Sequence, residues 1–322
     1  CSGRRPCWPA RSMAVELSVV VLSWNTADLL VACLRSLRAD VSATSREIVV
    51  VDNGSADGSA DRVAAGFPEV RLIRNPVNLL YSEGNNLGAR AAAGEFLCLL
   101  NSDTEVSPGA LDRLVAFLRT HPEHAMVGPR FVNPDGSLQA YCRRLPRLAD
   151  ELWQWSWLRN ARPARAADAR ARMRDFDHLH SRDVEQPLGA CVVMARAEYL
   201  ALGGLDPELS LFFNDVDLCL RLRARGRKIH YLAEATVLHH HGASTRKQQE
   251  EFGNPLWHKN RIAFVRKHHG RGGALLVRLM LRLSLAGMWL RIVAGRKSWS
   301  EKRAVLARLR SFAARCAPGA RP

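Results

Sequence analysis

Three aspartates in this chain stand where a carboxylate could do chemistry. Asp52 and Asp103 each follow a hydrophobic run with the character of a buried strand, and Asp215 begins an otherwise apolar helical pattern together with Asp217. Charged side chains are costly to bury without a purpose. In open α/β sheets, ligands bind outside the carboxyl ends of the strands. The pattern therefore indicates a ligand site rather than scattered surface acids.

Asp52 and Asp103 also have structural interpretations. A carboxylate at Asp103 suits a hard divalent cation such as Mg²⁺, which prefers oxygen ligands and shares its coordination shell with phosphates. The same residue could instead be a turn acid or a helix N-cap before Pro108. Asp52 lies in DNGSADGS, a segment that also makes a good turn. Both interpretations stay open on these residues alone.

The acids of the segment FFNDVDLCLRLRARG at residues 212–226 point in different directions. Two residues along a helix subtend about 200°, so Asp215 and Asp217 cannot share one face. We expect one of them to face the site and Asp217 to pair with Arg221 at i+4. The alternative is that both only complement the helix dipole.

Three histidines follow an apolar strand in VLHHHGAST. Strand alternation sends His239 and His241 to one face and His240 to the other, so at most part of the cluster serves one site. Imidazole is a common metal ligand, although a lone histidine at such a place is often structural.

Strands and helices alternate in the first part of the chain. The pattern predicts strands at 17–25, 46–52, 70–76 and 95–103, and helices at 27–40, from a cap at Asp57 or Ser59 through Ala65, at 82–94 and near 108–120. This alternation favours a parallel sheet covered by helices on both faces. The first strand-to-helix turn, SWNTAD, lacks the GxGxxG of a dinucleotide-binding domain, which argues against NAD.

The second part of the chain contains one irregular segment. Residues 126–139 predict strand, turn and strand, residues 186–206 a strand and a helix, and residues 228–242 a further β-rich segment. Residues 146–183 show no clear strand and hold Trp153, Trp155 and Trp157 before an Arg/Ala-rich stretch. We interpret 146–183 as a variable insertion over the site.

Composition indicates a globular protein with a basic tail. The chain is 47% hydrophobic, with a formal net charge of +16 and a pI near 10.3. Such a charge would suit nucleic acid, anionic lipid or phosphorylated substrates. Residues 270–322 hold 12 Lys and Arg but a single acid, Glu301. The eight scattered cysteines have no CxxC spacing and predict reduced core residues, and residues 1–14 are set aside as a disordered or non-native leader.

The tail segment 274–295 is apolar but interrupted by Arg278, Arg282 and Arg291. Each arginine at a bilayer centre costs about 2.5–3.5 kcal/mol on insertion scales, which disfavours spanning. Arg278 and Arg282 share a helix face, as in a helix lying in the interface of an anionic membrane. The alternative is a helix packed on the catalytic domain. Because aromatic residues are not interleaved with the charges, nucleic acid is not expected as a partner.

The motifs together resemble the family 2 inverting glycosyltransferases with a GT-A fold, especially the rhamnosyltransferase-like branch. The resemblance covers roughly residues 17–269 and rests on LSVVVLSWN, VVVDNGSADGS, NPVNLLYSEGNNLGARAAAGEFLCLLNSD, GPRFVNPDGSLQAYCRRLP, LGACVVMAR, GGLDPELSLFFNDVDLCLRLRARG and VLHHHGAST. It implies an α/β fold with a Rossmann-like mixed sheet flanked by helices, followed by an amphipathic helical tail.

The resemblance implies a nucleotide-sugar donor site. Asp52 matches the aspartate that recognises the pyrimidine, with the turn from Ser23 to Asn25 nearby. Asn78 and Asn86 match donor-side asparagines.

A metal site is implied beside the donor. Asp103 matches the last residue of the DxD motif, here reduced to Asn101-Ser102-Asp103, so one carboxylate must do what two do elsewhere. His239 matches the HxxGxS histidine that completes the metal and diphosphate site, whereas His240 and His241 do not match it. The implied cofactor is Mg²⁺ or Mn²⁺.

The resemblance also implies an acceptor site. Asp215 matches the second residue of a Glu-Asp pair and is the expected general base. Asn214 replaces the first residue, a departure that removes a charge and would lower the pKa of Asp215. Gly189 and Ala190 match an acceptor-side turn, and the pair Arg143 and Arg144 matches arginines that meet acceptor phosphate.

We expect an inverting glycosyltransferase that moves a sugar, such as L-rhamnose from dTDP-rhamnose, to a cell-envelope polysaccharide or lipid-linked acceptor. The expected parts are a leader at 1–14, a catalytic domain at 15–269 and a basic tail at 270–322. The expected location is the cytoplasm, at the inner face of the cell membrane. The alternatives are another donor, such as a UDP-hexose or UDP-galactofuranose, and a catalytically silent glycan-binding protein at the membrane.

Overall fold

The structure is a computed structural model that describes residues 15–153, 162–240, 254–295 and 298–316. Its elements in chain order are β1 (Leu17–Ser23), α1 (Ala27–Ala39), β2 (Arg46–Asp52), α2 (Ser59–Gly66), β3 (Arg71–Arg74), α3 (Leu80–Ala91), β4 (Phe96–Asn101), β5 (Thr104–Val106), α4 (Ala110–Thr120), β6 (His124–Val132), β7 (Leu138–Gln139), α5 (Leu148–Trp153), α6 (Arg162–Ala171), β8 (Arg182–Asp183), β9 (Cys191–Ala195), α7 (Arg196–Ala201), α8 (Asn214–Ala224), β10 (Lys228–His239), α10 (Pro255–Ala294) and α11 (Trp299–Arg315).

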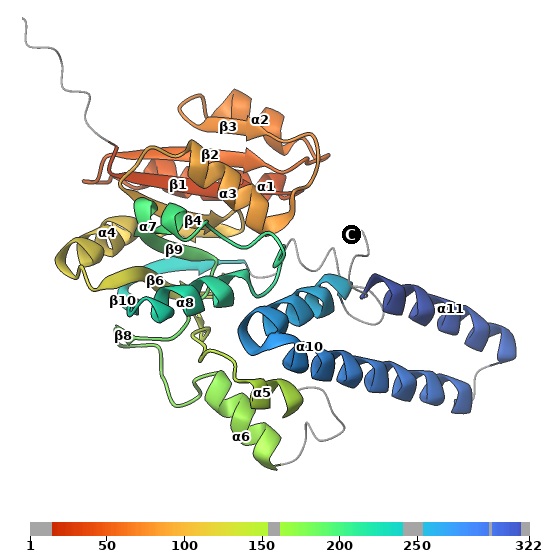
Figure 1. The fold of residues 1–322 in the computed structure, drawn as a ribbon. Coiled ribbons are helices and arrows are strands. Elements are labelled where there is room, and N and C mark those ends of the chain that lie inside the picture. Colours follow the sequence, from red (N-terminus) through yellow and green to blue (C-terminus); the bar gives the residue numbers. More distant parts are fainter. Residues whose placement is uncertain (1–14, 154–161, 241–253, 296–297, 317–322) are drawn as a thin grey trace, which may run out of the picture.

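One mixed sheet forms the centre of the molecule (Figure 1). Its main strand order is β3-β2-β1-β4-β9-β6-β10-β5, with β7 paired to β6 and β8 paired to β10. The strands β3, β2, β1 and β4 run parallel to one another, and β6 runs parallel to β10. Strand β9 runs antiparallel between β4 and β6. Strands β5, β7 and β8 are also antiparallel to the strands they pair with. The predicted mixed sheet is therefore confirmed, while the wholly parallel sheet that alternation alone favours is wrong at β9 and at these three strands.

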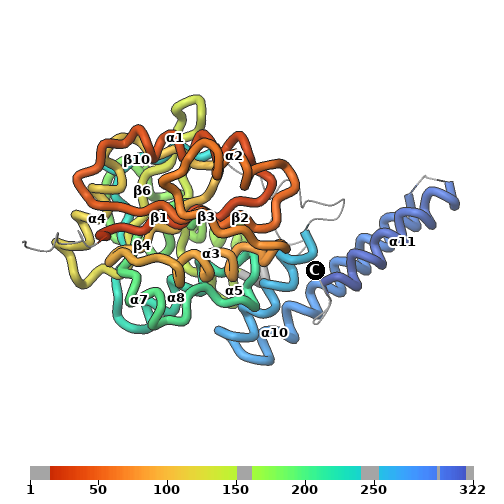
Figure 2. Tube along the Cα trace, turned by 90° about the horizontal axis from the view of Figure 1, so that it is seen from above, coloured from red at the N-terminus to blue at the C-terminus, as the bar shows by residue number. Residues whose placement is uncertain are grey.

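Helices cover both faces of this sheet (Figure 2). In β1, Val19 and Val21 pack in one buried cluster with the apolar sides of α1 and α4. Val20 points to the other cluster, which includes residues of α3, α7 and α8. Burial on both faces explains why the strands are continuous apolar runs rather than alternating ones.

The cysteines that the structure describes lie in the core, as predicted. The six cysteines within the described residues are buried and form no disulfide. The Sγ atoms of Cys98 and Cys191 lie 3.9 Å apart across the β4–β9 pair. Cys1 and Cys7 lie outside the described residues.

Helices α10 and α11 lie against each other and extend away from the sheet (Figures 1 and 2). Asn254 caps α10 by accepting from the Leu256 backbone N–H, and Ser298 and Glu301 form a capping box on α11. Gly270, at φ 75°, interrupts α10 with a kink. By length and composition α10 is apolar enough to cross a membrane.

The expected division at residues 269 and 270 falls at this kink, where the two helical segments of α10 meet, and the first segment begins earlier, at Pro255. The described residues form three clusters of buried side chains, and the third joins α10 and α11 to Leu209 in the loop before α8. Within 146–183 the chain forms α5 and α6, which pack together. Trp155 and Trp157 lie outside the described residues. The division into domains, and the role of 146–183, stay predictions.

Candidate active site

A cavity of about 420 Å³ lies at the carboxyl ends of β1 and β4 and beside the first turn of α8. Six of the candidate site residues expected from the sequence line it: Asn78, Asp103, Gly189, Ala190, Asp215 and His239. The remaining lining residues are Leu22, Trp24, Asn53, Leu80, Tyr81, Asn101, Ser102, Tyr141, Leu188, Leu211, Phe212, Phe213 and Asn214.

Asp103 and His239 are neighbouring side chains of this cavity, and both are of types that commonly bind metal ions. Asp103 is 7% exposed and His239 is 4% exposed, and the His239 Nε2 lies 3.5 Å from the Asp103 Oδ1. That separation is long for a hydrogen bond but close enough for both atoms to bind one cation. The His239 Nδ1–H donates to the Gln139 Oε1 at 3.0 Å, which directs Nε2 toward Asp103. The donor set of one carboxylate and one oriented imidazole fits a divalent cation.

A second group of ligand-type side chains lies at the opposite ends of the strands. His124 and His230 occupy the starts of β6 and β10, and both contact the Asp183 Oδ1, at 2.8 Å and 2.7 Å. Their ligand atoms lie within 4.8 Å of one another. Because His239 ends β10, this group is at the other end of that strand from the cavity and is separate from the site.

Asp215 occupies the first turn of α8 and faces the cavity. The Gln186 Nε2 donates to its Oδ2 at 2.9 Å, and the Val216 backbone N–H donates to its Oδ1 at 2.9 Å. A Cβ on Gly189 would lie 3.2 Å from the Asp215 Cβ, so a residue without a side chain gives this carboxyl group its room. Burial raises the pKa of Asp215 above its ordinary value. A carboxylate with a raised pKa is a stronger base.

Asn214 is fixed beneath this base. Its Nδ2 donates to the Ser82 Oγ at 3.2 Å, and its Oδ1 accepts from the Asp215 backbone N–H at 2.7 Å. The expected lowering of the Asp215 pKa by the missing charge is a comparison with relatives that have an acid there. Within this chain the effect of burial is the larger one, and the pKa of Asp215 is raised.

Asp217 points away from the cavity into an ion-pair network, which confirms the predicted i+4 pair. The Arg221 Nε lies 2.7 Å from its Oδ2, and the Lys267 Nζ and His268 Nε2 each lie 2.8 Å from its Oδ1. Burial alone would raise the pKa of Asp217. The hydrogen bonds from His268 and Lys267 outweigh burial and hold that pKa below its ordinary value.

Asp52, expected at the donor, does not line the cavity, but one oxygen of its carboxylate has no partner among the described residues. Asp52 is 4% exposed, its Oδ2 accepts from the Ser55 backbone N–H at 3.3 Å, and its Oδ1 is buried with no hydrogen bond among the described residues. A buried acceptor of this kind is costly unless a donor reaches it. Next to it, the Asn53 amide donates to the Asn78 Oδ1 at 2.8 Å, which fixes the loop leading into Leu80.

Three residues expected at the donor have side chains bonded within the protein and do not line the cavity. The Ser23 hydroxyl lies 3.0 Å from the Thr26 hydroxyl, and the Asn25 Oδ1 accepts from the Ala56 backbone N–H at 2.8 Å. The Asn86 Nδ2 donates to the Leu205 O at 2.7 Å. These contacts hold loops in place around the site, and donor contact by these three residues stays a prediction.

Arg143 and Arg144, expected at the acceptor phosphate, do not line the cavity either. The Arg143 guanidinium lies over the ring of Tyr141, 4.9 Å from its centroid, and burial lowers the Arg143 pKa. The Arg144 Nη2 lies 3.0 Å from the Asp175 Oδ2. Of these two arginines, Arg143 is the one that contacts a residue of the cavity wall, Tyr141.

Sequence reasoning missed several polar residues of the site. Tyr81 lies with its hydroxyl 3.1 Å from the Asn101 Oδ1 and 3.0 Å from the Gly189 O, which joins the two walls of the cavity. Gln186 and Gln139 orient Asp215 and His239. Each glutamine is distant in sequence from its partner, so no local spacing indicates the contact. The only signal was their place at the ends of motifs flanking the predicted strands.

Comparison with known proteins agrees with this geometry. A family model described as Glycosyl transferase family 2 matches residues 18–176. The N-acetylglucosaminyl-diphospho-decaprenol L-rhamnosyltransferase of Mycobacterium tuberculosis is 30% identical over 291 residues, covering 85% of this chain and 92% of the relative. The chain belongs to glycosyl transferase family 2. As a rhamnosyltransferase-like member of that family, it is a glycosyltransferase.

Other family 2 relatives and solved structures are consistent with this assignment. The O-antigen biosynthesis protein RfbC of Myxococcus xanthus is 29% identical over 72% of this chain and 18% of its own length. The structure of GalNAc-T7 with UDP, GalNAc and Mn²⁺ matches with a TM-score of 0.54 and 18% identity over 71% of this chain and 44% of that one. The mannosyltransferase PcManGT from Pyrobaculum calidifontis, in complex with GDP-Man and Mn²⁺, matches with a TM-score of 0.51 and 17% identity over 92% and 80%. The predicted GT-A fold is confirmed.

Proposed function

We propose that this glycosyltransferase moves L-rhamnose from dTDP-rhamnose to a lipid-linked saccharide by a single inverting displacement. The observation behind the mechanism is the arrangement of one cavity in which Asp215 faces the pair Asp103 and His239. One side can therefore accept a proton while the other meets a diphosphate. The sugar and the acceptor class come from the relative, whose name states both.

Asp215 is the proposed general base. The acceptor hydroxyl loses its proton to the Asp215 carboxylate as its oxygen attacks the anomeric carbon from the side opposite the leaving nucleoside diphosphate. Gln186 holds that carboxylate in place, and the absence of a side chain at Gly189 leaves room for it. Attack opposite the leaving group inverts the anomeric configuration without a covalent intermediate.

Asp103 and His239 would hold the divalent cation, Mg²⁺ or Mn²⁺. Such a cation neutralises charge on a leaving diphosphate. Gln139 fixes the imidazole orientation that this role needs. Support for a metal comes also from two solved structures with the same fold that contain Mn²⁺ together with a nucleotide or nucleotide sugar.

The base of the donor is proposed to be a pyrimidine. The unpartnered Oδ1 of Asp52 would accept from the ring N–H of thymine or uracil. This contact does not distinguish dTDP-rhamnose from a UDP-sugar, so the donor panel below includes both.

We also propose peripheral contact with an anionic membrane at the cytoplasmic face. Leu275, Leu279 and Leu283, which are 66%, 51% and 59% exposed, form a stripe along α10. Arg282, which is exposed, borders this stripe on the helix surface. An apolar stripe beside cations fits a helix that lies in the interface of anionic lipids.

The test is nucleoside diphosphate release from dTDP-, UDP- and GDP-sugars with Mn²⁺ or Mg²⁺, with and without a lipid-linked saccharide. We expect release from dTDP-rhamnose and its loss in Asp103→Ala. Release from a different sugar nucleotide would replace the donor. Equal release by Asp103→Ala would refute the proposed metal site, and no release from any donor with any acceptor would refute the proposed function.

A further inference from the structure

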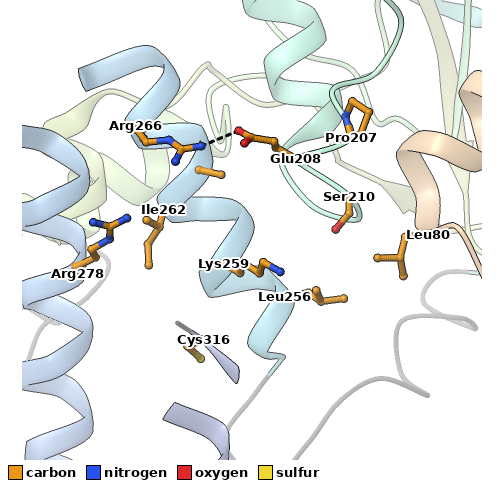
Figure 3. Close-up of a pocket in the computed structure, with 11 residues that line it drawn as sticks. Leu80, Pro207, Glu208, Ser210, Leu256, Lys259, Ile262, Arg266, Arg278 and Cys316 are labelled. Carbon is orange, nitrogen blue, oxygen red and sulfur yellow. Dashed lines mark hydrogen bonds and ion pairs between the residues drawn. The ribbon is translucent and has the colours of Figure 1, made fainter. Parts of the chain in front are cut away.

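A second cavity, of about 340 Å³, lies between the loop that precedes α8 and the two segments of α10 (Figure 3). Leu80 lines both this cavity and the catalytic one. Ser210 lines the second cavity, and its neighbour Leu211 lines the catalytic cavity. The two spaces therefore adjoin at Leu80 and along the loop of Ser210 and Leu211.

The wall of the second cavity combines cations with apolar surface. Lys259, Arg266 and Arg278 supply three positive charges, and Glu208 supplies one negative charge, with the Arg266 Nη2 at 2.7 Å from the Glu208 Oε2. The lining therefore has a net positive charge of two. The apolar lining residues are Leu80, Pro207, Leu256, Ile262 and Ala263. Such a wall fits a ligand with an anionic head and a hydrocarbon chain.

Arg278 shows where the anion would bind. It lies on the second segment of α10 and faces the cavity across from Ser210 and Leu80 (Figure 3). Its Nε is buried and has no hydrogen-bond partner among the described residues. A buried donor without an acceptor costs free energy, and a phosphate oxygen would supply that acceptor. Arg278, Arg266 and Arg271 also line a shallow adjoining hollow of about 400 Å³.

We propose that this second cavity binds the diphosphate of a polyprenyl-diphosphate-linked acceptor. A diphosphate esterified at both ends has two negative charges, which match the net charge of the wall. Its isoprenyl chain would follow the apolar lining toward the exposed leucines of α10, and its sugar would enter the catalytic cavity past Leu80. The inference rests on the proposed function, because it assumes that the acceptor is lipid-linked.

This placement differs from the one expected for Arg143 and Arg144, neither of which lines either cavity. It also differs from general attraction to anionic phospholipid, which needs no defined cavity beside the active site. Phosphate binding at Arg143 and Arg144, and general attraction to anionic phospholipid, each predict different effects of single substitutions from those of a diphosphate site at Arg278. They are separated by the variants below.

The first test is calorimetric binding of farnesyl diphosphate to the full chain in detergent. We expect Arg278→Gln to weaken binding about ten- to one hundred-fold, as for loss of a charged hydrogen bond. Arg278→Lys, which keeps the charge, should lose less. Arg282→Gln removes the same charge one turn along the helix, away from the cavity, and should bind farnesyl diphosphate as the wild type does. Farnesol, which has no phosphate, should bind weakly, and equally to the wild type and to Arg278→Gln. Equal binding by Arg278→Gln and wild type, equal losses in Arg278→Gln and Arg282→Gln, or a loss only in Arg143→Gln would overturn the inference.

The second test measures transfer. Arg278→Gln should raise KM for a polyprenyl-diphosphate-linked saccharide about tenfold or more, while KM for the nucleotide sugar and for a neutral alkyl glycoside of the same saccharide stays unchanged. If transfer proceeds in the wild type but Arg278→Gln leaves the KM of the diphosphate acceptor unchanged, the inference fails while the proposed function stands. If the wild type transfers to no acceptor, yet binds farnesyl diphosphate through Arg278, the proposed function fails instead.

Discussion

At the scale of single residues, the site depends on how each carboxylate is held. Asp215 combines a raised pKa with access to the cavity, whereas Asp217, two residues later, has a lowered pKa and no access. The difference arises from partners. Asp215 accepts from one amide side chain, Gln186, while Asp217 contacts three basic side chains. The same residue type is thus the proposed base in one position and a member of an ion-pair network in the other.

The pH dependence of turnover should depend on the hydrogen bond that Gln186 donates to Asp215. Its hydrogen bond to the Asp215 carboxylate favours the charged form and lowers the Asp215 pKa against the larger effect of burial. Gln186→Leu should therefore raise that pKa further and move the acidic limb of the kcat/KM profile to higher pH. Ser181→Ala, which removes a hydrogen bond to the exposed Glu234 carboxylate outside the cavity, is the control, and its acidic limb should stay in place. An unshifted limb in Gln186→Leu would argue against Asp215 as the base.

Asp215→Asn should lower kcat about 10²- to 10⁴-fold without destabilising the fold. A carboxyl group whose pKa is raised on folding adds stability below its unfolded pKa and loses that contribution as pH rises through the folded pKa. At pH 7 the charged form is therefore unfavourable, and a neutral amide removes this cost.

Thermal unfolding measures the effect. The Tm of Asp215→Asn at pH 7 should equal or exceed that of the wild type, and the gain should shrink toward the ordinary aspartate pKa of about 3.9. A clear loss of Tm at pH 7 would mean that Asp215 is a structural residue.

At the scale of elements, α10 is tied to the catalytic part by polar contacts. Asp217 on α8 contacts Lys267 and His268 on α10. Asn260, only 1% exposed, accepts from the backbone N–H groups of Leu211 and Phe212 at 3.1 Å each. The first segment of α10 thus fixes the loop that lies between the two cavities.

Asp217→Asn should weaken this connection. We expect it to destabilise the protein by about 2–4 kcal/mol, near the lower end for a broken buried ion pair because Lys267 is partly exposed. Since the Asp217 pKa is lowered on folding, its contribution is present above the unfolded pKa and is lost as pH falls through the folded pKa.

Chemical denaturation at pH 7 checks this value. Asp61→Asn, which removes an exposed pair with Arg74, is the matched control and should cost less than about 1 kcal/mol. Equal effects in both variants would show that the network between α8 and α10 adds no particular stability.

The elements were largely predictable, but their long-range contacts were not. Apolar runs ending in Asp52 and Asp103 predicted strands and their carboxyl-end acids, because burial on both faces leaves a local signal. The antiparallel direction of β9 leaves no such signal, since a buried strand has the same composition in either direction. The contact of Asn260 with residues about 50 positions earlier is likewise invisible in local spacing.

At the scale of the whole molecule, the exposed stripe of α10, the second cavity and the catalytic cavity follow one another. Leucines 275, 279 and 283 are exposed, the cavity at Arg278 follows, and the catalytic cavity adjoins it at Leu80. This order fits an enzyme that receives its acceptor from a membrane surface.

The double variant Leu279→Glu with Leu283→Glu should weaken binding to anionic vesicles. Removing two leucines from the interface should cost about 1.5–3 kcal/mol each, so at least a tenfold loss in a sedimentation assay is expected. Leu179→Glu, at an equally exposed leucine far from α10 in the sequence, should bind like the wild type. Equal binding by the double variant would refute membrane contact through this stripe.

The proposed mechanism is a single displacement in which Asp215 deprotonates the acceptor. The most direct measurement is the anomeric configuration of the transferred sugar, determined by NMR of the product and compared with that of the nucleotide-sugar donor. We expect inversion in the wild type and no product signal from Asp215→Asn. Retention of configuration, or inverted product formed by Asp215→Asn at the wild-type rate, would contradict it.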